Sequence, residues 1–185
     1  MALSSVVDGI KSNLVSTVKG ASDVITALRE AVKTQVVGSL QNVSEVGTST
    51  LDGVSDVVEA AVVSAKEVGT SVVEASKDVV SAAVTAVVDA GGDVIVASTK
   101  AVSGAVKGAG EVGGDAGEVA LSAILGAVDA AGKLGKNTET VTKEAVVGAI
   151  KAADAIGSEA GKSVRKTLLA AASLPKELVE SAIKG

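Results

Sequence analysis

Apolar residues recur along this chain with the period of an α-helix. From Val58 to Val87 the apolar face advances by a mean step of about 3.6 residues, whereas a strand would alternate with a period of two. Similar spacing extends over most of the 185 residues. The pattern therefore predicts an all-α protein.

One column of positions eleven residues apart holds only aliphatic residues and glycine, from Leu14 to Val179. Between Gly47 and Gly157 glycine takes every second place in this column and so recurs every 22 residues. A neighbouring column that starts at Val62 repeats in the same phase. We interpret these columns as a stripe that faces either other helices or lipid. The stripe consists of Val36, Gly47, Val58, Val62, Gly69, Val80, Val84, Gly91, Val102, Val106, Gly113, Ile124, Val128, Gly135, Val146, Ile150, Gly157 and Leu168.

Eleven residues in three turns correspond to about 3.67 residues per turn, which predicts a straight or weakly right-handed supercoil. The phase is unbroken before Pro175, although a hairpin loop would usually insert residues outside the repeat. We therefore expect one long, nearly continuous hendecad-repeat helix that packs into a straight or right-handed bundle, tube or filament. Kinks or hairpin bends are the alternative at the glycine-rich points, which are Gly91–Gly92, 104–117 and 132–137.

The repeat divides the chain into three segments. Residues 1–13 form a helical lead-in, and residues 14–172 hold the repeat. Residues 173–185 are expected to form a short C-terminal helix, with Ser173 as its cap and Pro175 in its first turn.

Glycine on an apolar helical stripe needs an explanation, because each interior glycine costs about 1 kcal/mol of helix stability relative to alanine. In one explanation, glycine lets helix backbones approach closely at an interface between helices. In the other, glycine weakens the helix in water, so that it forms only on a lipid surface or a partner. Valine, which also favours helix only weakly, fits both explanations.

The composition removes several function classes. The chain has no Phe, Tyr, Trp, His or Cys, and it has 21 glycines. The absence of Cys excludes disulfides, thiolate chemistry and Cys-ligated zinc. A net charge of −5 argues against non-specific nucleic-acid binding, which needs a basic face. A core without aromatic side chains also predicts that a lone compact fold is only marginally stable.

Targeting signals are not evident in the sequence. The chain does not start with a cationic stretch, an apolar run and a cleavage site, so we expect no secretory signal. Its longest uncharged stretch, 34–44, spans 11 residues, whereas a membrane-spanning helix needs about 20 apolar residues. We expect a cytoplasmic protein, with a position peripheral to a membrane or lipid body as the alternative.

One motif matches a catalytic pattern. Residues 108–113 read G-x-G-x-x-G, and Asp129 follows at the distance seen in dinucleotide-binding sites. Such a loop must join a strand directly to a helix, and the only strand-like run, 94–96, lies too far upstream. We interpret these glycines as part of the repeat.

Acidic residues do not form a convincing site either. Asp52, Asp56 and Glu59 share one helix face and are interpreted as an outward acidic strip. The segment 89–93 lacks the further oxygen ligands of a calcium loop. No serine has a histidine to activate it. We expect no enzyme, no cofactor, no metal site and no small-molecule substrate.

Two segments carry a family resemblance. Residues 98–102 and 142–147 read STKAV and TKEAVV, and they resemble the eleven-residue units of synucleins. The period over residues 14–170 is also similar to that of perilipins and late-embryogenesis-abundant proteins. This resemblance implies a hendecad helix that forms on lipid or on drying. The period and the glycine usage also resemble long prokaryotic hendecad coiled coils, which implies a seam between helices.

Two classes of function fit these patterns. The first is a non-enzymatic structural protein, whose copies form a homo-oligomer or filament through an Ala/Gly/Val helix seam. The second is a peripheral coat on a droplet, granule or membrane, with a synuclein- or perilipin-like amphipathic helix. A desiccation protectant that stays disordered until drying is a further alternative. The expected partners are copies of the chain or a lipid surface, and not nucleic acid.

Overall fold

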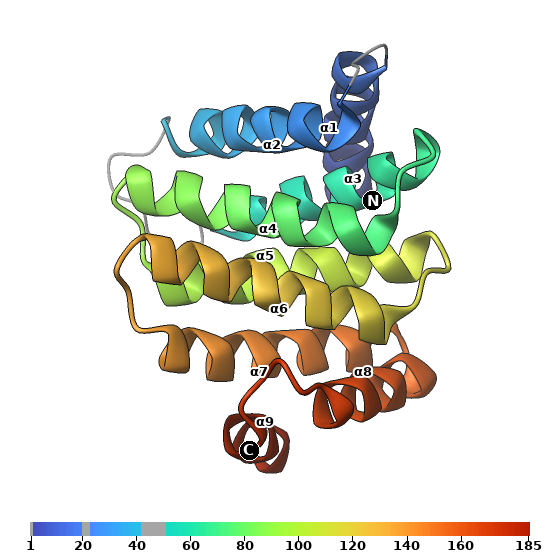
Figure 1. The fold of residues 1–185 in the computed structure, drawn as a ribbon. Coiled ribbons are helices and arrows are strands. Elements are labelled where there is room, and N and C mark those ends of the chain that lie inside the picture. Colours follow the sequence, from blue (N-terminus) through green and yellow to red (C-terminus); the bar gives the residue numbers. More distant parts are fainter. Residues whose placement is uncertain (1, 20–22, 42–50) are drawn as a thin grey trace.

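The computed structural model describes residues 2–19, 23–41 and 51–185. Within these ranges the regular structure is entirely helical, so the all-α prediction is confirmed (Figure 1). The helices are α1 (Ala2–Val18), α2 (Val24–Leu40), α3 (Asp52–Glu67), α4 (Val72–Asp89), α5 (Val94–Glu111), α6 (Ala116–Lys133), α7 (Thr138–Ile156), α8 (Ser158–Ala170) and α9 (Lys176–Lys184).

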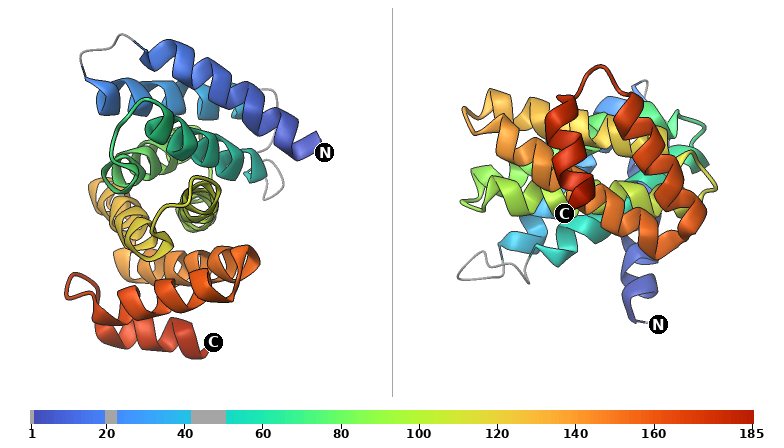
Figure 2. Two further views of the ribbon diagram at one scale, coloured as in Figure 1. Left: turned by 90° about the vertical axis from the view of Figure 1, so that its right-hand side faces the viewer. Right: turned by 90° about the horizontal axis from the view of Figure 1, so that it is seen from below.

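The helices stack in two layers. The most extensive packing joins helices that are two places apart in the chain, namely α4 with α6, α5 with α7 and α3 with α5. Odd-numbered helices therefore form one layer and even-numbered helices the other (Figure 2). Contacts between consecutive helices hold the two layers together. The result is a stack of helical repeats in which the chain advances from α1 at one end to α9 at the other (Figure 1).

The 22-residue unit of the sequence is one helix together with one turn. Helices α4, α5 and α6 each span 18 residues, and a short turn completes each repeat. The unbroken phase predicts one nearly continuous helix, but the chain instead forms separate helices joined by turns. Turns do not disturb the phase, because they are part of the repeat. Bends fall at Gly91–Gly92 and within both 104–117 and 132–137, the three glycine-rich points named above.

The turns before α4, α5, α6 and α7 each end in a side chain that caps the next helix. Ser71, Asp93, Asp115 and Asn137 follow one another at intervals of 22 residues and are the N-caps of α4 to α7. The carboxylate of Asp115, for example, accepts hydrogen bonds from the backbone N–H groups of the second and third residues of α6, at 2.9 and 3.1 Å. Such caps satisfy backbone donors that have no partner inside the helix. They fix where each helix begins.

The glycines of the eleven-residue column are the other half of the turn. Gly69, Gly91, Gly113 and Gly135 have φ angles of 77°, 88°, 64° and 65°, in the left-handed region that side chains disfavour. In each turn the N–H of the following residue donates to a carbonyl five residues back, as in Thr70 to Ala65 at 2.9 Å. This arrangement is a Schellman helix end. These glycines end helices, so the interpretation that they lie on a buried stripe is wrong for them.

Replacing a turn glycine should destabilise the protein moderately. For Gly113→Ala we expect a loss of about 1–2 kcal/mol in the free energy of unfolding, because a Cβ in the left-handed conformation crowds the next carbonyl. Gly132→Ala is the matched control, since its added Cβ meets nothing closer than 3.8 Å and its φ is not positive. Thermal unfolding followed by circular dichroism measures both. Equal melting temperatures for the two variants would contradict this role of Gly113.

The C-terminal end departs from the repeat. Gly157 separates α7 from α8, and α8 has 13 residues, fewer than the helices before it. The expected short terminal helix is present as α9, with Pro175 at its N-cap position and no side-chain cap. Ser173 therefore does not cap it. At the other end, α1 runs through residue 13 without a break, so no structural boundary separates the lead-in from the repeat.

Candidate functional site: the packing seam

The aliphatic members of the predicted stripe lie inside the stack. Eleven of them are buried between helices of the same chain, and Val128 is partly buried. The buried ones are Val36, Val58, Val62, Val80, Val84, Val102, Val106, Ile124, Val146, Ile150 and Leu168. Gly69, Gly91, Gly113 and Gly135 lie in exposed turns, Gly157 lies between α7 and α8, and Gly47 lies outside the described residues. The stripe is thus divided between core and turns.

A different set of glycines brings the helices together. Gly104, Gly126 and Gly148 also follow one another every 22 residues, and each lies against the helix two places earlier. A Cβ on Gly104 would overlap the backbone carbonyl oxygen of Ser55, 49 positions earlier. Gly126 meets the carbonyl oxygen of Lys77 in the same way, at the same separation. Backbones this close tolerate no side chain at the crossing point.

The same register recurs in a hydrogen bond. The hydroxyl of Ser122 in α6 donates to the carbonyl oxygen of Val73 in α4, 49 positions earlier, at 2.6 Å. Gly148 of α7 also lies against Thr99 of α5, where an added Cβ would be 3.0 Å from the carbonyl oxygen. The packing seam, defined by Gly104, Gly126 and Gly148 with the carbonyls they contact, is therefore one contact repeated along the stack. The 22-residue spacing of these three glycines is visible in the sequence, but the turn glycines have the same spacing, so spacing alone does not identify the packing seam.

Charged residues connect the odd-numbered helices. Lys11 of α1 forms an ion pair with Glu67 of α3 at 2.9 Å, and Lys100 of α5 pairs with Asp52 of α3. Glu59 is half-buried between α3 and α5 rather than on an outward strip. Burial raises the pKa of Glu59 to about 7, with further contributions from a hydrogen bond to the Glu111 side chain and from its charge.

Stability should therefore fall as the pH rises through the range in which Glu59 ionises. The pKa of Glu59 is about 7 in the folded protein and near its ordinary 4.5 in the unfolded chain. Between these values the folded state holds more protons, so its stability declines with rising pH. Glu59→Gln should remove this decline and stabilise the protein at pH 8 by on the order of 1 kcal/mol, allowing for solvent screening.

Urea unfolding at a series of pH values measures this effect. Glu74→Gln provides a control, because Glu74 lies on the exposed surface of the next helix. If Glu59→Gln leaves the pH profile of the wild type unchanged, Glu59 does not ionise at the α3–α5 interface in the way described.

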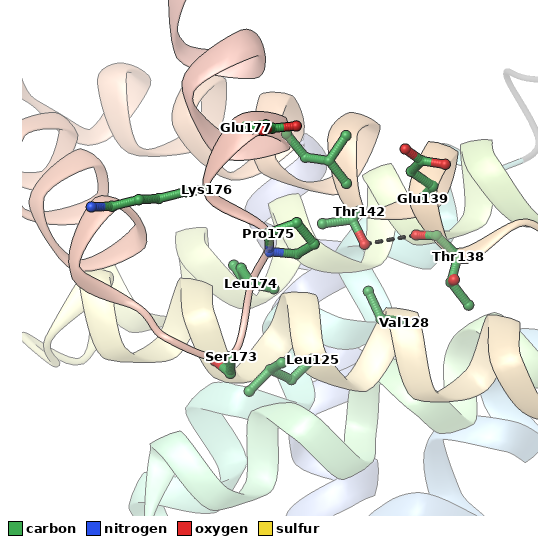
Figure 3. A pocket seen from close by; sticks show the side chains of 11 residues that line it. Leu125, Val128, Thr138, Glu139, Thr142, Ser173, Leu174, Pro175, Lys176 and Glu177 are labelled. Atoms are coloured by element: carbon green, nitrogen blue, oxygen red, sulfur yellow. Dashed lines mark hydrogen bonds between the residues drawn. The ribbon is translucent and has the colours of Figure 1, made fainter.

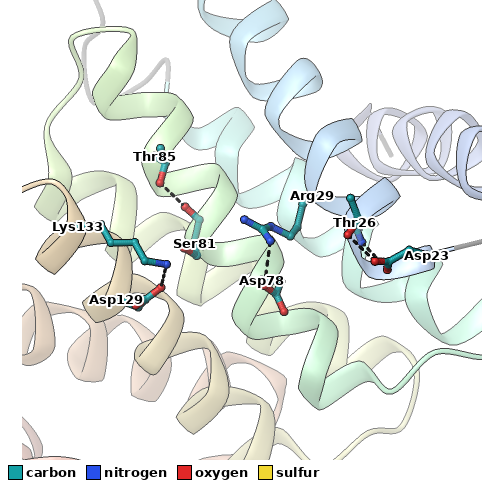
Figure 4. A network of polar contacts seen from close by, with 8 residues as sticks. All are labelled: Asp23, Thr26, Arg29, Asp78, Ser81, Thr85, Asp129 and Lys133. Carbon is teal, nitrogen blue, oxygen red and sulfur yellow. Dashed lines mark hydrogen bonds and ion pairs between the residues drawn. The ribbon is translucent and has the colours of Figure 1, made fainter.

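The even-numbered layer carries a second polar network (Figure 4). Arg29 of α2 lies 3.8 Å from the carboxylate of Asp78 in α4, and Lys133 pairs with Asp129 within α6 at 2.7 Å. A small groove of about 240 Å³ lies beside Arg29, Lys33 and Lys133. Since carboxylates already oppose two of these cations, the network connects helices and does not form a free anion site.

A larger groove lies near the C-terminal end, between α6, α7 and residues 173–178 (Figure 3). Its volume is about 590 Å³, and four aliphatic side chains form much of its wall: Leu125, Val128, Leu174 and Leu178. The hydroxyl of Thr142 faces Thr138 and donates to its carbonyl oxygen at 2.7 Å. The lining is thus mostly apolar, with polar groups at the edge.

The motif with catalytic spacing does not form a loop. Gly108 and Gly110 lie inside α5, where their backbone groups belong to the helix, and Gly113 lies in the turn. Gly108 packs against α3, since a Cβ there would be 2.9 Å from the carbonyl oxygen of Glu59. A phosphate-binding loop needs free N–H groups between a strand and a helix, so this segment is structural.

Across residues 2–19, 23–41 and 51–185, no group of three or more acidic, His or Cys side chains is placed to hold a metal ion. None of the helices described combines the length and apolar character needed to cross a membrane. Comparison with protein-family models and with curated proteins finds no match for this chain.

Proposed function

We propose that the protein is a non-enzymatic structural protein, a stack of helical repeats whose copies assemble into an elongated oligomer through their Ala/Gly/Val seam. One observation carries this proposal: the packing seam repeats the same contact, at the same separation of 49 residues, in three successive helix pairs. Because each helix pair packs in the same way as the pair before it, a second copy can continue the stack with the same contact at its end.

The first even-numbered helix supports assembly at the N-terminal end. Gly38 in α2 is exactly three repeats before Gly104, yet a Cβ built on it meets nothing within 4 Å. Among the described helices α2 is the first of its layer, so no described helix covers the packing position of Gly38. A groove of about 260 Å³ between α1 and α2 lies on the same part of the molecule and is lined by Ala27 and Ala31. Small side chains there allow another helix to approach closely.

Sedimentation velocity over a range of protein concentrations tests this proposal. The wild type should form particles larger than a monomer, and Gly38→Leu should shift them towards the monomer while the helix content is kept. Gly132→Leu, on an exposed part of α6, is the control and should assemble as the wild type does. A wild type that remains monomeric at every concentration contradicts the assembly.

Circular dichroism, recorded in buffer, with anionic vesicles and after drying, distinguishes the alternative functions. A chain that is disordered in buffer and becomes helical only on vesicles would favour a peripheral lipid coat. A chain that becomes helical only on drying would favour a desiccation protectant. Against both, the aliphatic stripe is already buried in the stack, so a lipid surface has to compete with the packing seam.

A further inference from the structure

We propose that the groove between α6, α7 and residues 173–178 is a docking site for a basic amphipathic helix of a partner protein. This inference does not depend on assembly, because the groove is separate from the α1–α2 end. Three features of the groove define its occupant: its place in the stack, its aliphatic wall and the charges at its edge.

The groove occupies the place of missing helical turns. Helix α8 lies beside the beginning of α6, since Gly117 faces Ser163 and Thr167. Because α8 ends at Ala170, no described helix lies along the second half of α6 on the side that faces away from α4. The segment that follows turns away and forms the far wall of the groove (Figure 3). The shape that fits this place is therefore a short helix that continues the line of α8 along α6.

The wall of the groove is more apolar than the equivalent positions of the preceding repeats. Leu125 of α6 takes the position that Ser81 and Ser103 hold in α4 and α5, at 22-residue spacing. Val128 is only partly buried, whereas its equivalents Val84 and Val106 are fully buried. An occupant that covers Leu125 and Val128 must present aliphatic side chains one helical turn apart.

The charge at the edge of the groove selects a basic helix. Glu139, Glu177 and Lys176 are the charged residues that line the groove, so two carboxylates stand against one ammonium group and the edge is acidic (Figure 3). Both glutamates are exposed, so they favour association with a cationic partner mainly through long-range attraction. A helix with lysine or arginine beside its aliphatic face would pack against the aliphatic wall and place its positive charges near the glutamates at the edge.

The second half of α7 provides a probe for this site. Residues 144–156 cover the equivalent place on α5, and they include Glu144 and Asp154. One fluorescent peptide keeps this sequence, and a second carries Glu144→Lys and Asp154→Lys. In fluorescence anisotropy with the full chain, the lysine peptide should bind at least threefold more tightly at low salt, and added salt should reduce the difference.

A single substitution in the full chain then locates the binding. Leu125→Ser installs the residue of the preceding repeats and should weaken peptide binding by about tenfold or more. Leu169→Ser is the matched control, because Leu169 occupies the same column two repeats later, is 38% exposed and does not line the groove. Circular dichroism verifies that both variants keep the wild-type helix content.

Four results would overturn the proposal. The first is that neither peptide binds the full chain up to the limit of solubility. The second is equal binding to the Leu125→Ser and Leu169→Ser variants. The third is that Leu125→Ser, without any peptide, lowers the sedimenting mass, because the occupant would then be a second copy of the chain. The fourth is that Leu125→Ser abolishes binding to anionic vesicles, because the groove would then hold lipid.

Discussion

Replacing Gly126 by alanine should destabilise the protein, whereas the same replacement at Gly38 should stabilise it. The two glycines occupy the same position of the repeat, in α6 and α2. An alanine Cβ at Gly126 overlaps the carbonyl oxygen of Lys77, and a backbone atom cannot rotate away as a side chain does. Because the added Cβ forces the two helices apart, we expect the free energy of unfolding to fall by about 3 kcal/mol.

In a chain that has not assembled, alanine at Gly38 changes only the intrinsic helix preference of that position, so the comparison is made at protein concentrations at which the chain is monomeric. A Cβ there meets no atom within 4 Å, so alanine should add up to about 1 kcal/mol of stability. Thermal and urea unfolding, both followed by circular dichroism, should give melting temperatures that move in opposite directions. A Gly126→Ala variant as stable as the Gly38→Ala variant would show that the helices do not approach each other as closely as the packing seam requires.

Removing two whole repeats should leave a folded protein, whereas removing eleven residues should not. Deletion of residues 94–137 takes out α5 and α6 and joins the cap Asp93 directly to the first residue of α7. The order of the two layers is kept, and Gly148 takes the place of Gly104 against Ser55. We expect a cooperative transition with roughly three quarters of the wild-type unfolding enthalpy, because that enthalpy scales with chain length.

Deletion of residues 94–104 keeps the hendecad phase but leaves only 105–111 of α5. A continuous hendecad helix would tolerate this change, since the stripe stays in register. A stack of helix-and-turn units would not, because the shortened helix no longer reaches across its neighbours. Differential scanning calorimetry distinguishes the two, and a cooperative transition in both deletion variants would contradict the 22-residue structural unit.

The sequence predicted the kind of secondary structure and the length of the repeat, but it did not decide the path of the chain. An eleven-residue period and a 22-residue helix with its turn produce the same aliphatic columns. The deciding signal was local: Asp93, Asp115 and Asn137 each follow a glycine by two residues, which is the combination of a helix end and a helix cap. Weighed as turn signals, these pairs would have favoured hairpins over a continuous helix.

The seam itself was harder to predict. Turn glycines and packing glycines share one spacing, and the packing glycines have no local signal such as a cap residue two positions later, because the helix that each contacts lies 49 positions earlier in the chain. Gly113 has a positive φ and open space around it, whereas Gly126 lies within a helix against the carbonyl of Lys77. The groove beside Leu125 could not be predicted at all, because it depends on where α8 ends relative to α6.

Within the part of the chain that the structure describes, extensive contacts join only helices one or two places apart in the sequence. Such a molecule has no central element on which every other part depends, so it can lose structure from its ends while the middle remains ordered. Amide hydrogen exchange should therefore be slowest in α4 and α5, which have a helix along each side within their layer, and should become faster towards α1 and α9. Protection against exchange would then follow the order of the helices along the stack, as a gradient rather than as a single protected core.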